Sequence, residues 1–565
     1  MVHASDGAGV RTSRTHDTHR HARGVKSKAE VVQGWTETRA RIEAMPLLAN
    51  VGALVDRAAA LFGDRIAWHF FERNERLSFR DAQALSLRAA GLFRERGVGR
   101  GDSVGVMVEN GPAYLGAWLG LARLGAAIVP INPRYTPREL QYVLKASRAL
   151  FLVIDADLLP RFDEIAATLE APFTGQVLVV GGTDPGVDWA AALAKAAPLR
   201  TGDDQAGADD IMNIQYTSGT TGFPKGCMVP QRLWLNAALT WGEYLRVPVG
   251  NVICNQRLFY QDGQFNAMMC LYKGSTYYIC SRPSAANFSK WLFDFKINYC
   301  FYFDPLFKVE PGIHDAESAL NLITIFGFSA ENHALLERRY GAIAREAYGM
   351  SEFAPSLIMP LDADVMVGSA SCGLVAPFTE AKVVDDAGAV VPNGEVGELC
   401  VRSHAMMTGY FGDPVATSET IVEGWLKTGD LFRQDEHGFF YIVGRKKDMV
   451  RRNAENIACR EVEEVVRMMP EILEVAMVPV KDATVGEEPK IYVQLRAGET
   501  RESVPPERIL AFCAEYLAPF KLPRYIAYVP AFTMTDSARV EKKTLIAGVA
   551  DLRANSFDRV DRVWR

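Results

Sequence analysis

The chain has 565 residues, which is too long for one compact core and predicts about four domain-sized units. Apolar residues make up 48% and charged residues 23%, ordinary values for a globular protein, so global disorder is excluded. The 62 basic and 68 acidic residues give a net charge of −6. Nucleic-acid binders usually show a basic excess or stripe, and the absence of both predicts a protein without a nucleic-acid partner.

Cysteine usage and hydropathy indicate the compartment. The nine cysteines are scattered, and no two of them form a CxxC pair, which disfavours a zinc ribbon or a disulfide framework and favours a reducing cytoplasm. The most apolar helical stretch, residues 113–122, stops at Arg123, whereas a membrane-spanning helix needs about 20 residues. No apolar region follows the first methionine, so we expect a cytoplasmic protein with neither a signal peptide nor an integral membrane segment.

Residues 1–30 differ from the rest in being polar and basic. They include His3, His16, His19 and His21. A histidine metal site is one interpretation, but few apolar residues are present to order its ligands, so a disordered tail is the better prediction.

Strands and helices alternate along the chain and predict an α/β fold. Residues 102–108 indicate a buried strand, residues 112–124 a helix and residues 126–131 a second strand, which together form a β-α-β unit with parallel strands. Thr136 then begins a helix as its N-cap, and Glu139 completes a capping box.

The most informative segment is residues 216–226, which follow an apolar strand at residues 211–215. Its glycines let the backbone fold closely around an anion, and its hydroxyls and lysine donate to phosphate oxygens. It does not fit the Walker pattern, because Gly226 follows the lysine. A plain turn is the alternative. The candidate phosphate ligands are Thr217, Ser218, Gly219, Thr220, Thr221, Gly222 and Lys225.

This segment closely resembles the phosphate loop of the adenylate-forming (AMP-binding) superfamily, which includes acyl-CoA synthetases, luciferases and nonribosomal-peptide adenylation domains. The resemblance extends over residues 45–550. It implies a large N-terminal domain of mixed and parallel sheets flanked by helices, expected at 31–445. A small mobile α+β C-terminal domain is expected at 446–565, with the hinge near Lys447.

Further motifs follow in the family's order, at residues 348–352, 427–430, 444–448 and 517–523. By resemblance, Tyr348 stacks on adenine beside Gly349, Ser351 touches the α-phosphate, and Glu352 binds Mg²⁺ together with Thr221. Asp430 accepts from the ribose hydroxyls, and Arg445 contacts ribose or phosphate. Taken alone, Asp430 would more often cap its own backbone, Glu352 would be a solvated charge and Tyr348 a core residue.

Four positions depart from the family pattern. Arg539 stands where the family has the lysine that meets the carboxylate and the α-phosphate; arginine keeps the charge but is bulkier and planar. Asn453 and Ala454 replace two glycines near the pantetheine path. Tyr260 stands where a histidine often gates the acyl site, and Ser351 replaces the usual threonine.

The acyl pocket is expected around Tyr260 and residues 327–330, namely Gly327, Phe328, Ser329 and Ala330. Residues 258–307 are rich in aromatic side chains, some of which belong to a sheet core. The remainder suits a bulky or ring-bearing acid, and aryl, medium-chain and polycyclic acids all stay open.

The resemblance implies an ATP-dependent carboxylic acid–CoA ligase that uses ATP, Mg²⁺ and coenzyme A. It forms an acyl-adenylate and then an acyl-CoA thioester, with Arg539, Glu352, Lys225 and Ser351 as catalytic residues. Lys447, Asn453 and Ala454 would serve the hinge and the CoA site. Two alternatives remain: a stand-alone adenylating enzyme that loads a carrier protein, and a weakly active member in which Arg539 does not replace lysine. A homodimer is compatible with the sequence.

Overall fold

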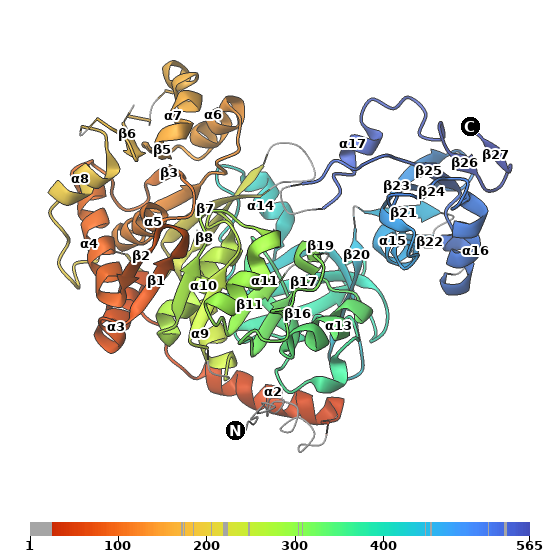
Figure 1. The fold of residues 1–565 in the computed structure, drawn as a ribbon, viewed down its shortest axis with the longest axis horizontal. Coiled ribbons are helices and arrows are strands. Elements are labelled where there is room, and N and C mark those ends of the chain that lie inside the picture. The colour runs from red at the N-terminus through yellow and green to blue at the C-terminus, as the bar shows by residue number, and fades with distance from the viewer. Residues whose placement is uncertain are drawn as a thin grey trace, which may run out of the picture.

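The computed structural model describes residues 25–565, except for 171–172, 175, 185, 205, 218–223, 247–248, 303, 308, 447, 453–454, 518 and 536–538. Figure 1 shows a large body that holds most of the chain and a smaller body, formed by the C-terminal end, set to one side of it. Within the described residues, no helix is long and apolar enough to cross a membrane.

A six-stranded sheet with the order β6-β5-β3-β4-β7-β8 forms one part of the large body. Strands β3 (Ser103–Met107) and β4 (Ala127–Pro130) pair in parallel and are joined by α5 (Pro112–Leu124), which confirms the predicted β-α-β unit. The other strands are β5 (Leu152–Asp155), β6 (Val177–Val180), β7 (Ile211–Thr217) and β8 (Lys225–Pro230).

A nine-stranded sheet with the order β15-β14-β13-β12-β11-β9-β10-β1-β2 forms the second part. Its central strands run parallel, and antiparallel strands close both edges. The strands are β1 (Ile66–Phe70), β2 (Glu75–Ser78), β9 (Asn251–Cys254), β10 (Thr276–Ile279), β11 (Tyr299–Tyr302), β12 (Leu322–Ile325), β13 (Ile343–Met350), β14 (Phe353–Ile358) and β15 (Leu374–Val375).

A smaller antiparallel sheet completes the large body, and it carries the ribose motif. Its strands are β16 (Thr379–Val384), β17 (Gly397–Ser403), β18 (Ile421–Val422), β19 (Trp425–Gln434) and β20 (Phe440–Arg445). A turn at residues 435–438 joins β19 to β20, and Asp435 accepts from the amides of His437 and Phe439.

Helices pack between and around the sheets of the large body. Helices α4 and α5 lie so close together that only glycine fits at position 120: a Cβ added there would lie 2.7 Å from the Cβ of Ala89. The predicted capping box of Thr136 and Glu139 begins α6. The helices are α2 (Lys28–Glu43), α3 (Val51–Phe62), α4 (Phe79–Glu95), α6 (Pro137–Ala146), α7 (Leu159–Asp163), α8 (Trp189–Lys195), α9 (Gln231–Tyr244), α10 (Gln261–Lys273), α11 (Ala285–Asp294), α12 (Asp304–Phe307), α13 (Ala330–Tyr340) and α14 (Pro414–Thr420).

The small body is an α+β unit with its own core. The strands are β21 (Met449–Arg452), β22 (Glu455–Ala458), β23 (Ile472–Asp482), β24 (Gly486–Leu495), β25 (Tyr525–Tyr528), β26 (Phe557–Asp558) and β27 (Val563–Trp564). The helices are α15 (Cys459–Arg467), α16 (Pro506–Tyr516) and α17 (Lys543–Ile546). The predicted class, a large α/β domain with a smaller C-terminal α+β domain, is confirmed.

The expected N-terminal tail is shorter than predicted among the described residues, and the C-terminal end belongs to a sheet. Residues 1–24, which include the four N-terminal histidines, lie outside the described residues. Ser27 caps α2 through a capping box with Glu30, so residues 28–30 of the expected tail are helical. At the other end, β26 and β27 extend the sheet of the small body beyond β25.

Candidate active site

The phosphate loop connects two paired strands. Thr217 at the end of β7 lies opposite Lys225 at the start of β8 in the antiparallel register. The Nζ atom of Lys225 lies 5.1 Å from the ring centroid of Tyr410. The expected ligands between them, Ser218, Gly219, Thr220, Thr221 and Gly222, lie outside the described residues, so their roles stay predictions.

Three predicted nucleotide ligands meet in one hydrogen-bonded group. The hydroxyl of Tyr348 donates to Asp430 Oδ2 at 2.6 Å, and Arg445 Nε donates to Asp430 Oδ1 at 2.8 Å. Asp430 and Arg445 are register partners on β19 and β20, which fixes their pairing. Burial and the neighbouring Asp430 carboxylate raise the pKa of Tyr348, so this residue stays a neutral donor.

Asp430 lies within strand β19, and its carboxylate is bound by side chains of other strands rather than by amides of its own turn. Its carboxylate is 2% exposed and accepts from side chains of other elements, while its amide donates to Thr428 Oγ1 at 3.1 Å. The alternative of a carboxylate that caps its own backbone is therefore wrong. Gly429 adopts a φ of 69° just before it, a left-handed conformation that favours glycine.

Glu352 lies in the turn that follows β13. It is 8% exposed, and Tyr410 donates to its Oε1 at 3.1 Å. Burial raises the pKa of Glu352, while hydrogen bonds and the charge of Arg445 oppose that shift. The neighbouring Ser351 accepts at its backbone oxygen from Gln261 Nε2 at 3.1 Å, and Gly349 is exposed.

The loop at residues 327–330 connects β12 to α13. Gly327 has a φ of 71°, and its amide donates to the buried carboxylate of Glu346. Ser329 caps α13 by accepting from the amide of Asn332, and Ala330 is the first residue of that helix. Phe328 is 3% exposed and packs on Tyr302 and Phe307 in a separate core cluster.

Helix α10 begins directly after Tyr260. The ring of Tyr260 lies 4.4 Å from that of Phe259, measured between centroids, and Gln261 ties the first turn to Ser351. Asp262 follows in the same turn. Helix α10 ends at Lys273, and the glycine that follows it, Gly274, has a φ of 73°. The expected gate residue therefore lies beside the α-phosphate motif.

The small body brings Arg539 toward these residues. The charges of Asp430 and Asp262 act on Arg539, while burial and the charge of Arg445 lower its pKa. Its side chain keeps contact with solvent. Lys542 is the other basic candidate of this segment, but it forms ion pairs with Asp448 at 2.6 Å and with Glu463 at 2.7 Å. Lys542 is thus held within the small body, whereas the exposed Arg539 interacts through its charge with Asp430 and Asp262.

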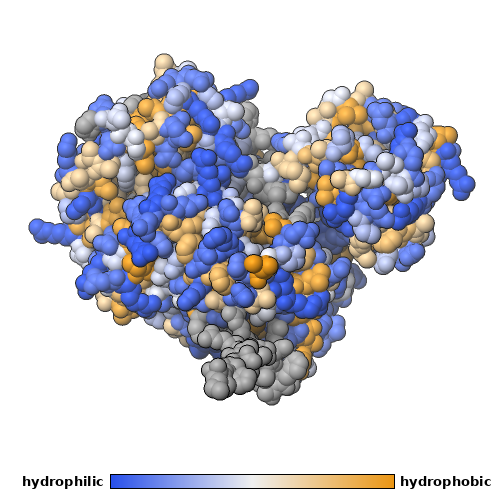
Figure 2. Space-filling model, viewed as in Figure 1, coloured by the Kyte–Doolittle hydropathy of each residue, from blue (hydrophilic) through white to orange (hydrophobic). Residues whose placement is uncertain are grey.

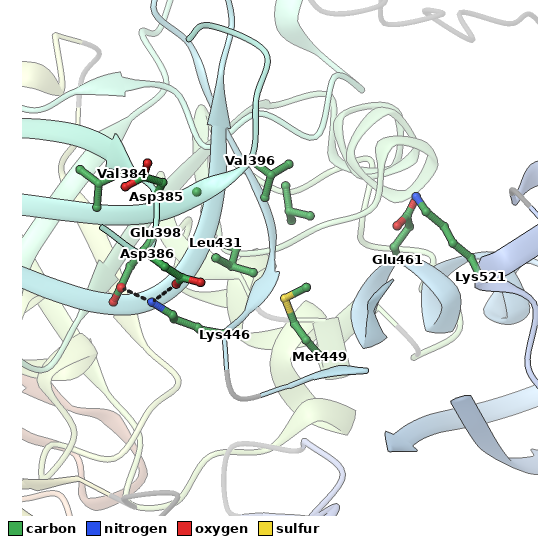
Figure 3. Close-up of a pocket in the computed structure, with 12 residues that line it drawn as sticks. Val384, Asp385, Asp386, Val396, Glu398, Leu431, Lys446, Met449, Glu461 and Lys521 are labelled. Atoms are coloured by element: carbon green, nitrogen blue, oxygen red, sulfur yellow. Dashed lines mark hydrogen bonds and ion pairs between the residues drawn. The ribbon is translucent and has the colours of Figure 1, made fainter. Parts of the chain in front are cut away.

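A separate pocket of about 340 Å³ lies at the junction of the two bodies, as Figure 3 shows. It is not the nucleotide site, because Leu431 lines it while the adjacent Asp430 faces the opposite side of β19. Lys446 pairs across its wall with Asp386 at 2.8 Å and Glu398 at 3.1 Å. The expected hinge and CoA residues Lys447, Asn453 and Ala454 lie outside the described part of the chain.

Three residues of the site escaped the sequence predictions. Glu346 holds the Gly327 loop, and burial raises its pKa to about 7. Tyr410 contacts both Glu352 and Lys225. Asp262 lies in the first turn of α10. Only Asp262 carried a local signal, since an acid two residues after the gate position stands in the first turn of a helix.

Figure 2 shows the surface hollowed between the large and the small body. Residues 55–411 match the AMP-binding enzyme family, and residues 461–539 match the AMP-binding enzyme C-terminal domain. The chain belongs to the AMP-binding enzyme family, in the branch of acyl-CoA synthetases and CoA ligases. The resemblance read from its motifs is thereby confirmed.

Two curated relatives and one solved structure illustrate this membership. "Putative acyl-CoA synthetase YngI" of Bacillus subtilis (strain 168) is 30% identical, covering 88% of this chain and 96% of the relative. A crotonobetaine/carnitine–CoA ligase of Escherichia coli is 29% identical, covering 81% and 90%. ATP-bound MatB from Rhodopseudomonas palustris is 25% identical, with a TM-score of 0.78, covering 88% and 98%.

Proposed function

We propose that the chain is an ATP-dependent carboxylic acid–CoA ligase that works through an acyl-adenylate. One observation carries this proposal: Tyr348, Asp430 and Arg445 form one hydrogen-bonded group of the large body, and the charge of Arg539 from the small body interacts with that of Asp430. A cationic residue beside a nucleotide cradle suits the attack of a carboxylate on a phosphate, because both reactants are anions.

In the first half-reaction, a substrate carboxylate oxygen attacks the α-phosphorus of ATP. A bond forms between them, the bond to the β-phosphate oxygen breaks, and pyrophosphate leaves. This chemistry needs little covalent help, so positioning and charge neutralisation supply the catalysis. Arg539 and Lys225 would neutralise the phosphates, while Tyr348 would face the adenine and Asp430 would accept from the ribose.

Glu352 is the residue that fits a magnesium ion. Its buried carboxylate accepts from the neutral Tyr410, and none of the described lysines or arginines forms an ion pair with it. Mg²⁺ is bound by one or two carboxylates together with substrate phosphates, and the described residues hold no larger acidic or histidine cluster. When bound, the ion would neutralise phosphate charge, with Thr221 as the second proposed protein ligand.

In the second half-reaction, the thiol of coenzyme A attacks the acyl-adenylate carbonyl and AMP leaves. We place the domain boundary between Arg445 and Met449, where the chain passes from the sheet of β20 to that of β21. Lys447 would be the pivot about which the small domain turns. The buried, free cysteines support a reducing compartment such as the cytoplasm.

Two assays on the purified chain test this function across a panel of acids. ATP–pyrophosphate exchange reports the first half-reaction, and CoA-dependent AMP release reports the second. Both activities with one acid are expected. Exchange without CoA turnover would instead indicate loading of a carrier protein. Neither activity, despite ATP binding, would indicate a member that Arg539 has left inactive.

A further inference from the structure

The segment at residues 406–411 connects the two charged parts of the candidate site. The amide of Met407 donates to the carbonyl of Glu352 at 2.7 Å. Further along, the amide of Phe411 donates at 2.8 Å to the carbonyl of the residue after Lys225, so the segment runs beside the start of β8. The expected magnesium ligand and the expected phosphate ligand are therefore tied to one short stretch of chain.

Tyr410 of this segment contacts both charges with different parts of its side chain. Its hydroxyl donates to Glu352 Oε1 at 3.1 Å, and Lys225 Nζ lies 5.1 Å from its ring centroid, over the face that attracts a cation. Its backbone is fixed as well, since its amide donates to Thr417 Oγ1 at 2.9 Å and it pairs with Cys227 of β8. Tyr410 is 8% exposed, so both contacts are largely shielded from water.

The two opposite charges lie close together, yet they do not pair with each other. Among the residues that the structure describes, neither Lys225 nor Glu352 forms an ion pair, although each lies against Tyr410. Burial raises the pKa of the Cys227 thiol, while the charges of Glu352 and Lys225 act on that pKa in opposite directions, so both charges lie near it. A direct ion pair would cancel both charges, whereas a neutral partner leaves each of them in place.

We propose that Tyr410 is a positioning residue that keeps Lys225 and Glu352 apart, so that the lysine stays available to ATP phosphates and the carboxylate to a metal ion. The ring holds the ammonium group, and the hydroxyl holds the carboxylate. This inference rests on the proposed ligase function, which assigns the two charged groups to phosphate and Mg²⁺.

Binding measured without turnover separates the two contacts of Tyr410. The probe is α,β-methylene-ATP, in which the bond that the reaction breaks is replaced by a stable one. Isothermal titration of this analogue in EDTA reports the lysine, and electron paramagnetic resonance of Mn²⁺ added with the analogue reports the carboxylate.

Tyr410→Phe keeps the ring and loses the hydroxyl. We expect its metal-free Kd for the analogue to stay within about twofold of that of the intact protein, because Lys225 keeps its aromatic partner. Its affinity for Mn²⁺ should fall at least about tenfold, the usual effect of removing the hydrogen-bond partner of a metal-ligating group. Unchanged Mn²⁺ affinity in this variant would overturn the role of the hydroxyl.

Tyr410→Leu loses both contacts, so Lys225 is free to pair with Glu352. We expect the metal-free Kd to weaken at least about fivefold. Adding Glu352→Gln removes the competing charge, and it should strengthen metal-free binding at least about fivefold more in the leucine variant than in the intact protein, a coupling that independent sites do not show. An equal effect of Glu352→Gln in both backgrounds would overturn the proposal that Tyr410 keeps the charges apart.

Tyr441 on β20 is the matched control, because it makes the same two kinds of contact elsewhere. It is 8% exposed, the guanidinium carbon of Arg433 lies 4.0 Å from its ring centroid, and its hydroxyl donates to Asp435 Oδ2 at 3.1 Å. Tyr441→Phe and Tyr441→Leu should leave both binding constants within about twofold of those of the intact protein. Losses equal to those of the Tyr410 variants would show a general structural effect and overturn the proposal.

The same measurements distinguish this inference from the ligase function. Binding constants that are unchanged in all Tyr410 variants would overturn the positioning role and leave the ligase function standing. An intact protein that binds the analogue and Mn²⁺ but catalyses no pyrophosphate exchange with any acid would count against the ligase function alone.

Discussion

At the scale of single residues, we expect Arg539 to serve the first half-reaction. Lys542, the other basic candidate, is held inside the small domain by Asp448 and Glu463. The charge of Arg539 interacts with those of Asp430 and Asp262. A guanidinium stays protonated and offers a planar fork of donors, so it can contact a carboxylate and a phosphate oxygen together.

We predict that Arg539→Ala lowers adenylate formation at least tenfold while sparing thioester formation from supplied adenylate. The reason is that the guanidinium neutralises charge only while the carboxylate attacks phosphorus. Pyrophosphate exchange and thioester formation measured on the same preparation check this. Lys543→Ala, at an exposed neighbour of the same segment, serves as the control. Unchanged exchange in Arg539→Ala would remove this residue from the catalytic set.

Asp430 shows why sequence alone leaves a residue's role open. Its local context, after Thr428 and Gly429, equally allowed a carboxylate that caps its own backbone. Its actual partners, Tyr348 and Arg445, lie 82 and 15 residues away. Only the pairing of β19 with β20 and the packing on β13 bring them together. The family motifs assigned all three residues to the nucleotide site. The local sequence around Asp430 gave no indication of its two distant partners.

At the scale of elements, the segment between β20 and β21 is anchored on both sides. Lys446 pairs with Asp386 and Glu398 of the large body, and its amide donates to the Gly429 carbonyl at 2.8 Å. Asp448 pairs with Lys542 of the small body. That its two neighbours are bound to different bodies supports the proposed pivot at Lys447.

We predict that Lys447→Pro spares pyrophosphate exchange but blocks CoA-dependent release of AMP. Proline fixes φ near −65° and restricts the residue before it, so a backbone rotation needed between the half-reactions would be lost. Rapid-quench measurement of each half-reaction tests this. Lys447→Ala removes the same side chain and keeps φ free, so it should retain both steps. Equal loss of both half-reactions in the proline variant would place the pivot elsewhere.

Elements with strong local signals were predictable to within a few residues. The helix at Pro112–Leu124 has proline at its first position and glycine after its last, and the structure gives the same bounds. Helix α10 shares only the glycine after its last residue, because it begins at Gln261 and has no proline at its first position. Its role depends on which side chains find partners in the folded protein, which periodicity does not reveal.

At the scale of the whole molecule, the small body is in contact with the nucleotide site of the large one. Arg460 on α15 donates to the Gly327 carbonyl at 3.4 Å, and the charge of Arg539 interacts with that of Asp430. A cation at this junction would suit the first half-reaction, in which two anions meet. If the small domain turns at the proposed hinge, the contact of Arg460 with Gly327 would be lost, and the position of the domain would then be coupled to the chemistry.

The end of the chain is fastened to the small domain by a buried lysine. Lys490 on β24 is 1% exposed, and its Nζ donates to the carbonyls of Leu552 at 2.7 Å and Ala554 at 3.1 Å. Burial lowers the pKa of Lys490 from 10.5 to about 8. The hairpin of β26 and β27 follows directly and pairs with β25, so this lysine helps to hold the strands that cover the edge of the sheet.

We predict that this lysine makes the small domain more stable as the pH rises from about 8 toward 10.5. Between these values the unfolded chain keeps the proton that the folded chain has released, so the free energy of unfolding increases with pH. From about pH 7 to 9.5 the gain amounts to about 2 kcal/mol. Urea unfolding at both pH values should show this gain in the intact protein relative to Lys490→Met, but not relative to Lys481→Met. If the pH dependence in Lys490→Met equals that of the intact protein, another group must be responsible for the change.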